Sequence, residues 1–125
     1  MTKINKSAIH EGKEERYSLD TVFDGYAFPY PIHKAKSCHY EAKIYKVKDM
    51  ILVDMAIDAT LEVEDTGDCT PFDLALSFEE NSNVIMEEED GESEGYIFPG
   101  NSFDLDDLAR LLIISRIPIV LHKEV

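Results

Sequence analysis

Alternating apolar and polar residues give the strongest structural signal in this chain, in the segment from Val53 to Glu64. A period of two over that length places one side of a β-strand in a core and the other side in water. The preceding segment, 38–48, alternates less strictly but also predicts a strand, and Asp49-Met50 suits a tight turn between the two. Together the two segments predict an antiparallel hairpin. The apolar positions of the longer strand are Val53, Met55, Ile57, Ala59, Leu61 and Val63.

A turn and a third strand follow this hairpin. The segment 65–68, Asp-Thr-Gly-Asp, has the composition of a turn, because glycine tolerates positive φ and aspartate hydrogen-bonds to its own backbone. Pro71 can begin the next strand, where its missing N–H costs least. Apolar residues then alternate with polar or small ones from Phe72 to Glu79. Three consecutive strands of this kind predict a meander.

Residues 102–116 predict a helix. Ser102 or Asp104 can cap its N-terminus, and Pro118 prevents its continuation. Two acidic residues, Asp106 and Asp107, fall in the first turn, where the helix dipole favours negative charge. Both sides of this helix are apolar, so its second side is either covered by the sheet and segment 28–30 or presented to a partner. One side consists of Leu105, Leu108, Ala109 and Leu112, and the other of Leu111, Ile113 and Ile114.

These elements predict an α+β fold in a single domain, 1–125. We expect mainly antiparallel β-sheet, a meander that could close towards a barrel, with one C-terminal helix. Residues 1–37 define no element strongly, although 17–23 could form a short strand or the edge of a helix. Residues 80–95 are rich in carboxylates, which repel one another, so we expect a mobile, solvated acidic loop there. Residues 119–121 could form a last edge strand.

Charge is distributed unevenly along the chain. The net charge is −14, with 12 basic and 26 acidic residues; residues 1–50 have a net charge of +2 and residues 51–125 a net charge of −16. Such a chain is a poor non-specific binder of nucleic acid, because phosphate contacts need lysine and arginine. The acidic half suits a basic protein surface better. No apolar run is long enough for a membrane span or a signal peptide, so we expect a cytoplasmic protein with no membrane partner.

Catalytic and metal-binding patterns are weak. Cys38 and Cys69 have no C-x-x-C spacing, and the histidines have no H-x-x-x-H spacing, so reduced thiols and surface histidines are the simplest interpretation. Cys69 stands among acids, which would blunt a nucleophilic thiol. We therefore expect no metal, no cofactor, no small-molecule substrate and no enzymatic activity. A deep pocket lined by Cys38, His39 and His122 together would contradict that expectation.

A basic set lies in and before the first predicted strand. Its lysines, interleaved with Tyr40 and Tyr45, could bind RNA through phosphate contacts and base stacking. Lysines on an exposed strand also protect a sheet edge against aggregation, and that interpretation stays open beside the first. The set consists of Lys34, Lys36, His39, Lys43, Lys46 and Lys48.

The order of strand, turn, strand, acidic run and a helix ending in Ile-Pro resembles the bacterial YceD family, the large ribosomal RNA subunit accumulation proteins. The resemblance covers about residues 50–120 and rests on the segments 61–78 and 103–118. Where family members typically carry a cysteine pair and an arginine in the turn, this chain carries Asp65, Asp68 and Gly67. A metal site or an RNA contact that depended on those residues would be lost here. The family-motif turn consists of Asp65, Gly67, Asp68, Cys69 and Pro71.

The resemblance implies a non-enzymatic ribosome-biogenesis factor that supports accumulation of large-subunit ribosomal RNA. Its partner would be precursor large-subunit ribosomal RNA, bound through the basic set, or a basic ribosomal protein. The alternative is an acidic protein–protein adaptor without RNA contact. The candidate protein-binding residues are Glu87, Glu88, Glu89, Asp90, Leu111 and Ile114.

Overall fold

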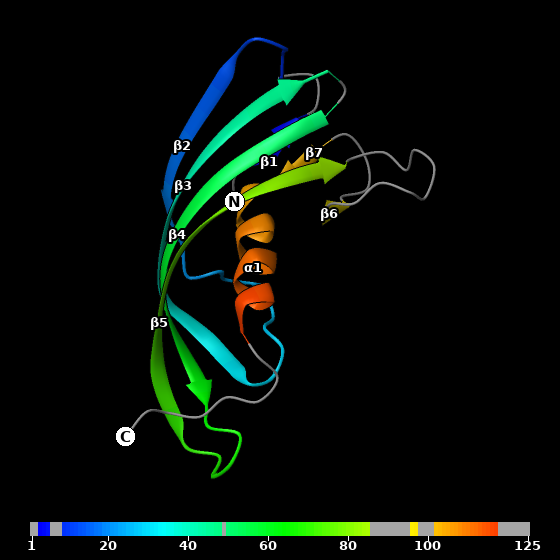
Figure 1. Ribbon diagram of the computed structural model, residues 1–125. Coiled ribbons are helices and arrows are strands. Elements are labelled where there is room, and N and C mark those ends of the chain that lie inside the picture. Colours follow the sequence, from blue (N-terminus) through cyan, green and yellow to red (C-terminus); the bar gives the residue numbers. More distant parts are fainter. Residues whose placement is uncertain (1–2, 6–8, 49, 86–95, 98–101, 118–125) are drawn as a thin grey trace.

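A computed structural model describes residues 3–5, 9–48, 50–85, 96–97 and 102–117. The main sheet has five strands in the order β2-β3-β4-β5-β6, and α1 lies against its concave side (Figure 1). A second sheet pairs β1 with β7 just before the helix begins. The elements are β1 Lys3–Asn5, β2 Glu14–Asp20, β3 Ile32–Val47, β4 Met50–Glu64, β5 Pro71–Ile85, β6 Tyr96–Ile97, β7 Ser102–Asp104 and α1 Leu105–Arg116.

The predicted α+β class and the antiparallel meander are confirmed, and the suggestion of a barrel is wrong. Strands β2 to β5 pair antiparallel with their neighbours in sequence, whereas β6 adds to β5 in parallel. The sheet stays open, with β2 and β6 at its two edges. A helix fills the concave side, so the apolar side chains on that side are buried without closure of the sheet.

Several predicted boundaries differ from those observed. Residues 80–85, assigned to the mobile acidic loop, extend β5, because they continue the ladder with β4 as far as Val84. The weakly patterned stretch 1–37 contains β1, β2 and the first six residues of β3. Residues 86–95 and 119–121 lie outside the described residues, so neither the rest of that loop nor the last predicted strand is described here.

Two β-bulges explain why the start of β3 escaped detection. Register shifts occur between Ile32 and Lys34 and again between Ala35 and Ser37, so two residues of β3 oppose one of β4 at each place. Each shift interrupts the alternation of buried and exposed residues on which the prediction of a strand depends. Beyond Cys38 the ladder is regular, and there the predicted hairpin with β4 is observed.

The core lies between the inner face of the sheet and α1. Strand β4 is the central strand, and every second residue from Ile51 to Val63 is buried. The helix contributes Leu105, Leu108, Ala109, Leu112 and Ile113, each of which has no exposed surface. Burial of these side chains supplies the main stabilising free energy, at about 25 cal/mol per Å² of apolar area.

The N-terminus of α1 is fixed to the sheet by hydrogen bonds. Asp104 is the N-cap and accepts from the backbone N–H of Asp106, while its other carboxylate oxygen accepts from the hydroxyl of Tyr26. Asp106 is buried, and its Oδ1 accepts a hydrogen bond of 2.5 Å from the Tyr40 hydroxyl on β3. A buried carboxylate without donors would cost several kcal/mol, so this bond determines where the helix begins on the sheet.

The other parts of α1 are fixed by two arginines. Arg110 donates to Asp107 at 3.0 Å and to the carbonyl of Ala27 at 3.0 Å. Arg116 lies over the ring of Phe78 and donates to Glu80 at 3.2 Å, both on β5. The helix is thus attached to β3 at one end and to β5 at the other.

Replacing Tyr40 with phenylalanine removes one donor from the buried Asp106 carboxylate. We expect the free energy of unfolding at pH 7 to fall by about 1.5–3 kcal/mol, the usual worth of a hydrogen bond to a charged group. Urea unfolding followed by circular dichroism measures this change. The matched control is Tyr45→Phe, because the Tyr45 hydroxyl only accepts from Asn81 on the outer side of the sheet. Its effect should stay within about 0.5 kcal/mol, and equal losses in both variants would contradict the assignment.

Tyr40 also makes the stability of the folded protein depend on pH in the alkaline range. Burial and the hydrogen bond to Asp106 raise the pKa of Tyr40 well above 10.0. The unfolded chain releases this proton first, so the folded protein loses stability as pH rises above about 10. Tyr40→Phe lacks this contribution, and its stability should fall less steeply than that of the wild type in that range.

Candidate functional site: the outer face of the sheet

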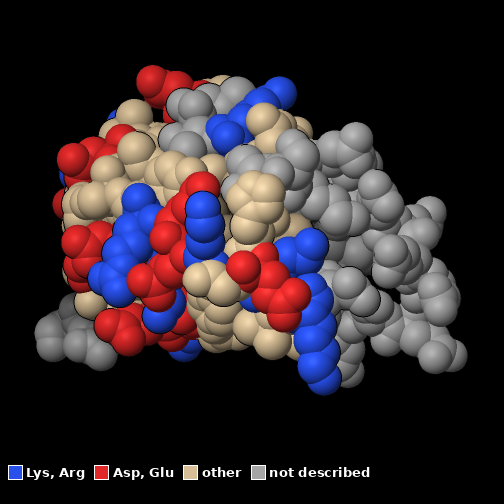
Figure 2. All heavy atoms as spheres, turned by 90° about the horizontal axis from the view of Figure 1, so that it is seen from above, with Lys and Arg blue, Asp and Glu red and all other residues tan. Residues whose placement is uncertain are grey.

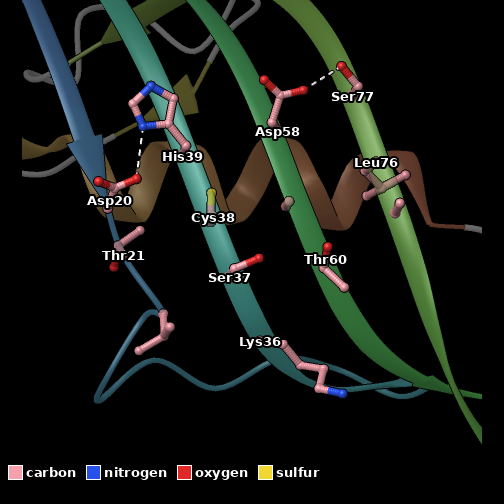
Figure 3. Close-up of a pocket in the computed structure, with 13 residues that line it drawn as sticks. Asp20, Thr21, Lys36, Ser37, Cys38, His39, Asp58, Thr60, Leu76 and Ser77 are labelled. Carbon is pink, nitrogen blue, oxygen red and sulfur yellow. Dashed lines mark hydrogen bonds and ion pairs between the residues drawn. The ribbon is translucent and has the colours of Figure 1, made fainter.

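The side of the sheet away from α1 carries the polar residues of four strands, and we call it the outer face. The registers align these residues into rows that cross the sheet, such as Asp20, His39, Asp58 and Ser77 (Figure 3). The outer face consists of Glu14, Arg16, Ser18 and Asp20 on β2; Lys34, Lys36, Ser37, His39, Glu41, Lys43 and Tyr45 on β3; Leu52, Asp54, Ala56, Asp58, Thr60 and Glu62 on β4; and Asp73, Ala75, Ser77, Glu79, Asn81 and Asn83 on β5.

The predicted basic set does not form one surface. Lys34, Lys36, His39 and Lys43 lie on the outer face. Lys46 falls on the opposite side, because its partner Ile51 is buried, and Lys48 lies in the turn after β3 with φ 57°. The structure therefore brings together four of the six predicted residues.

Carboxylates neutralise most of the charge of the basic residues that share this face. Lys36 Nζ lies 3.0 Å from a carboxylate oxygen of Asp73. Lys43 Nζ lies 3.4 Å from Glu14 and 3.5 Å from Asp54. The view in Figure 2 shows lysines and arginines interspersed with acidic side chains rather than gathered into a basic patch. Pairing of this kind reduces the potential that would attract a polyanion.

The outer face as a whole is acidic. Its four cations are Arg16, Lys34, Lys36 and Lys43, opposed by eight carboxylates. Arg16 is itself paired with Glu14 at 2.9 Å, and this pairing lowers the pKa of Glu14. A surface with this balance favours a positively charged partner. The eight carboxylates belong to Glu14, Asp20, Glu41, Asp54, Asp58, Glu62, Asp73 and Glu79.

Two hollows lie along the outer face. One, of about 840 Å³, lies over Ser37, Asp58, Thr60 and Ala75. The second, of about 670 Å³, includes Ser18, Glu41, Asp54, Ala56 and Glu79. Short side chains at the middle of the sheet produce both hollows, because they leave space between the longer residues around them. Each hollow is open to solvent, which suits a surface ligand better than an enclosed small molecule.

A serine, a histidine and an aspartate lie in line on this face. His39 Nδ1 is 2.8 Å from Asp20 Oδ1, and its Nε2 is 3.4 Å from Ser18 Oγ. Ser18 and Asp20 are two residues apart on β2, and His39 is opposite Asp20 on β3, so only the register could reveal this set. Catalysis by such a set also needs N–H groups aimed at a developing oxyanion. Ser18 lies in the middle of an exposed strand rather than at a sharp turn, so this set more simply orients the imidazole.

Cys38 and His39 do not converge, because neighbouring residues of a strand point to opposite sides of the sheet. Cys38 is buried on the helix side, where burial and the charge of Asp106 raise the pKa of its thiol to about 12. His122 lies outside the described residues. Within the described part of the chain, no group of three or more His, Cys, Asp or Glu residues is placed to hold a metal ion.

The family-motif turn is held by its aspartates. The Asp65 side chain accepts from the backbone N–H groups of Gly67, at 2.8 Å, and Asp68, at 3.2 Å. Asp68 accepts in turn from the backbone and hydroxyl of Thr70. The residue with positive φ is Cys69, at 64°, and not Gly67 as the composition of the turn predicts. In this chain hydrogen bonds to carboxylates therefore close the turn, with Pro71 beginning β5 directly after it.

The predicted protein-binding residues are only partly described. Leu111 and Ile114 on α1 are half-buried and pack against the core, while Ile113 is fully buried. The sheet therefore covers much of the second apolar side of the helix. Phe28 packs edge-on against Phe23, but Tyr30 is 61% exposed, so only part of segment 28–30 contributes to this packing. Glu87, Glu88, Glu89 and Asp90 lie outside the described residues.

Comparison of the chain with protein-family models, with curated proteins and with solved structures finds no match. No helix in the described part of the chain combines the length and the apolar character that crossing a membrane requires.

The two thiols should differ in reactivity. Cys69 is exposed, whereas Cys38 is 3% exposed and its raised pKa keeps it protonated at neutral pH. Because the thiolate is the reactive form, we expect one fast-reacting thiol per folded chain with an aromatic disulfide reagent at pH 8, and two in denaturant. Cys69→Ser should remove the fast reaction. Equal rates for both thiols in the folded protein would contradict the burial of Cys38.

The backbone of the turn gives a further prediction. A non-glycine residue at positive φ is strained, so Cys69→Gly should raise the free energy of unfolding by about 0.5–1 kcal/mol. Cys69→Ala is the control, because it removes the same thiol but keeps the Cβ that causes the strain. Its stability should stay within about 0.5 kcal/mol of the wild type. Urea unfolding of the three proteins measures the difference, and a glycine variant no more stable than the alanine variant would show that the turn is unstrained.

Proposed function

We propose that this protein is a non-enzymatic ribosome-biogenesis factor that supports accumulation of large-subunit ribosomal RNA, and that it acts by binding a basic ribosomal protein. The role in ribosome biogenesis comes from the resemblance of segments 61–78 and 103–118 to the YceD family. The mode of action comes from the outer face of the sheet. The observation that supports it most is the balance of charge there, with eight carboxylates against four cations.

A protein partner fits this surface better than direct contact with RNA. Release of counterions from phosphates requires cations that are available to the nucleic acid. Lys36 and Lys43 already lie within 4 Å of carboxylates on the same face, and Lys46 lies on the other side of the sheet. Basic ribosomal proteins, which must be kept from non-specific association before assembly, offer the opposite charge.

Depletion of the protein in the cells that produce it should lower the ratio of large-subunit to small-subunit ribosomal RNA, because an assembly factor protects its subunit from incomplete assembly and decay. Electrophoresis of total RNA and sedimentation of ribosomal subunits measure this ratio. Restoring the wild-type protein should restore the ratio. A ratio unchanged by depletion would contradict the proposed role in ribosome biogenesis.

A triple variant separates the two modes of action. Lys34→Gln, Lys36→Gln and Lys43→Gln together make the outer face more acidic. Binding of a basic protein should be kept or strengthened by this change, so the triple variant should restore the RNA ratio in depleted cells. Direct RNA binding predicts the opposite result. The triple variant would then fail to restore the RNA ratio, and its RNA affinity would no longer depend steeply on salt concentration. An isosteric variant that folds like the wild type but fails to restore the ratio would therefore favour direct RNA contact.

A further inference from the structure

The outer face is a sheet face without a partner among the described elements. The helix and the small β1–β7 sheet both lie on the concave side, and no described helix or strand covers the outer face (Figure 1). Four strands contribute to it over their whole paired length. A face of this size that carries hollows as well as charge is a natural place for a ligand to lie.

The two hollows lie one after the other along β4, and we call them together the trough. Its floor consists of the short side chains of Asp54, Ala56, Asp58 and Thr60, which line the two hollows in succession. At the midpoint the register places Glu41 on one side of Ala56 and Glu79 on the other. These longer side chains stand on β3 and β5, two strand spacings apart, or about 9.6 Å. The trough is therefore narrow and has an acidic residue on each side.

The narrow shape of the trough and its direction along β4 favour one shape of bound partner. A polypeptide that follows β4 between the side chains of β3 and β5 runs in the direction of the strands, which suits an extended chain. An extended chain fits, and its successive side chains point alternately to the two sides. The small residue Ala56 on the floor allows a backbone to approach closely.

The carboxylates of the trough favour a bound segment of a particular composition. Within the described residues, Glu41, Asp58 and Glu79 have no cation within ion-pairing distance, in contrast to the paired carboxylates Asp73 and Glu14. Asp58 accepts a hydrogen bond of 2.6 Å from Ser77, which holds its carboxylate at the floor (Figure 3). A lysine or arginine side chain reaching either side of the trough would meet a carboxylate that is not already paired.

We infer that the trough along β4 binds an extended, lysine- and arginine-rich protein segment, with Glu41 and Glu79 accepting alternate side chains from its two sides. This inference rests on the proposed function in that it names the part of a basic partner that the outer face would hold. It also gives a role to a surface on which, among the described residues, no group of three or more His, Cys, Asp or Glu side chains is placed to hold a metal ion.

Fluorescence anisotropy with labelled octalysine tests this inference on the full-length protein at about 0.15 M salt, where distant charges are screened. We expect saturable binding by the wild type. The double variant Glu41→Gln, Glu79→Gln should weaken it by about tenfold, because each lost ion pair contributes a fraction of the free energy of binding. Amide chemical-shift changes should centre on Ala56 and Thr60 in the wild type.

The matched control removes the same charge from the acidic run. Glu87→Gln with Glu89→Gln also eliminates two carboxylates, and binding should stay within about twofold of the wild type. Equal weakening by both double variants would show only non-specific attraction and would overturn the inference. Stronger weakening by the Glu87 and Glu89 variant would assign the binding to the acidic run instead. Tighter binding of a single-stranded RNA oligonucleotide than of octalysine would also overturn it.

The inference and the proposed function can fail separately. If depletion lowers the RNA ratio but the Glu41 and Glu79 variant restores it fully, the ribosomal role stands and the trough is not its binding site. If octalysine binds in the trough but depletion leaves the ratio unchanged, the trough is a binding site for basic segments and the ribosomal role is wrong.

Discussion

The hydrogen bond between the Tyr40 hydroxyl and the buried Asp106 carboxylate is the constraint on which the arrangement of the two layers depends. It joins the first turn of α1 to the middle of β3. Asp104, two residues before Asp106, caps the same turn. An acidic residue is stable there because it meets both the positive end of the helix dipole and a hydroxyl donor. Once this end is placed, the apolar stripe of the helix lies against β4, and Arg116 reaches β5. The helix thus occupies one side of the sheet, and the other side stays available.

The sequence predicts the regular parts of this structure and misses the parts that depend on register. Strands β4 and β5 and the helix are evident because their periods of two and about 3.6 are nearly uninterrupted. The beginning of β3 is hidden by its bulges, and β2 by its mixture of charged residues with Tyr17 and Leu19. The acidic and basic residues of the outer face are visible in the sequence, but the pairing of Lys36 with Asp73 spans 37 positions. Only the register brings eight carboxylates together with four cations on one face, and no local pattern in the sequence contains that arrangement.

Aspartate side chains hold the turn between β4 and β5. Where a cysteine pair typifies the YceD family, Asp65 and Asp68 accept hydrogen bonds from the backbone of the same turn. A carboxylate that accepts several N–H groups can hold a tight connection without a metal ion or a disulfide. The geometry of this hairpin therefore does not require a cysteine pair at these positions. The scaffold and any chemistry of that turn are separable properties.

The two bulges of β3 have a consequence for how this chain can change. The residues of β3 that face the helix change between even and odd numbers along the strand. Ile32 is even, Ala35 is odd, and the buried residues from Cys38 onward are even again. Each bulge reverses the parity, and the second restores what the first altered. Each bulge holds one extra residue, His33 or Lys36, so deletion of either one would restore regular alternation there and leave both ends of the strand facing as they do now. The segment 33–37 is thus a place where the chain can lose one residue at each bulge while β3 keeps its pairing with β4 on either side.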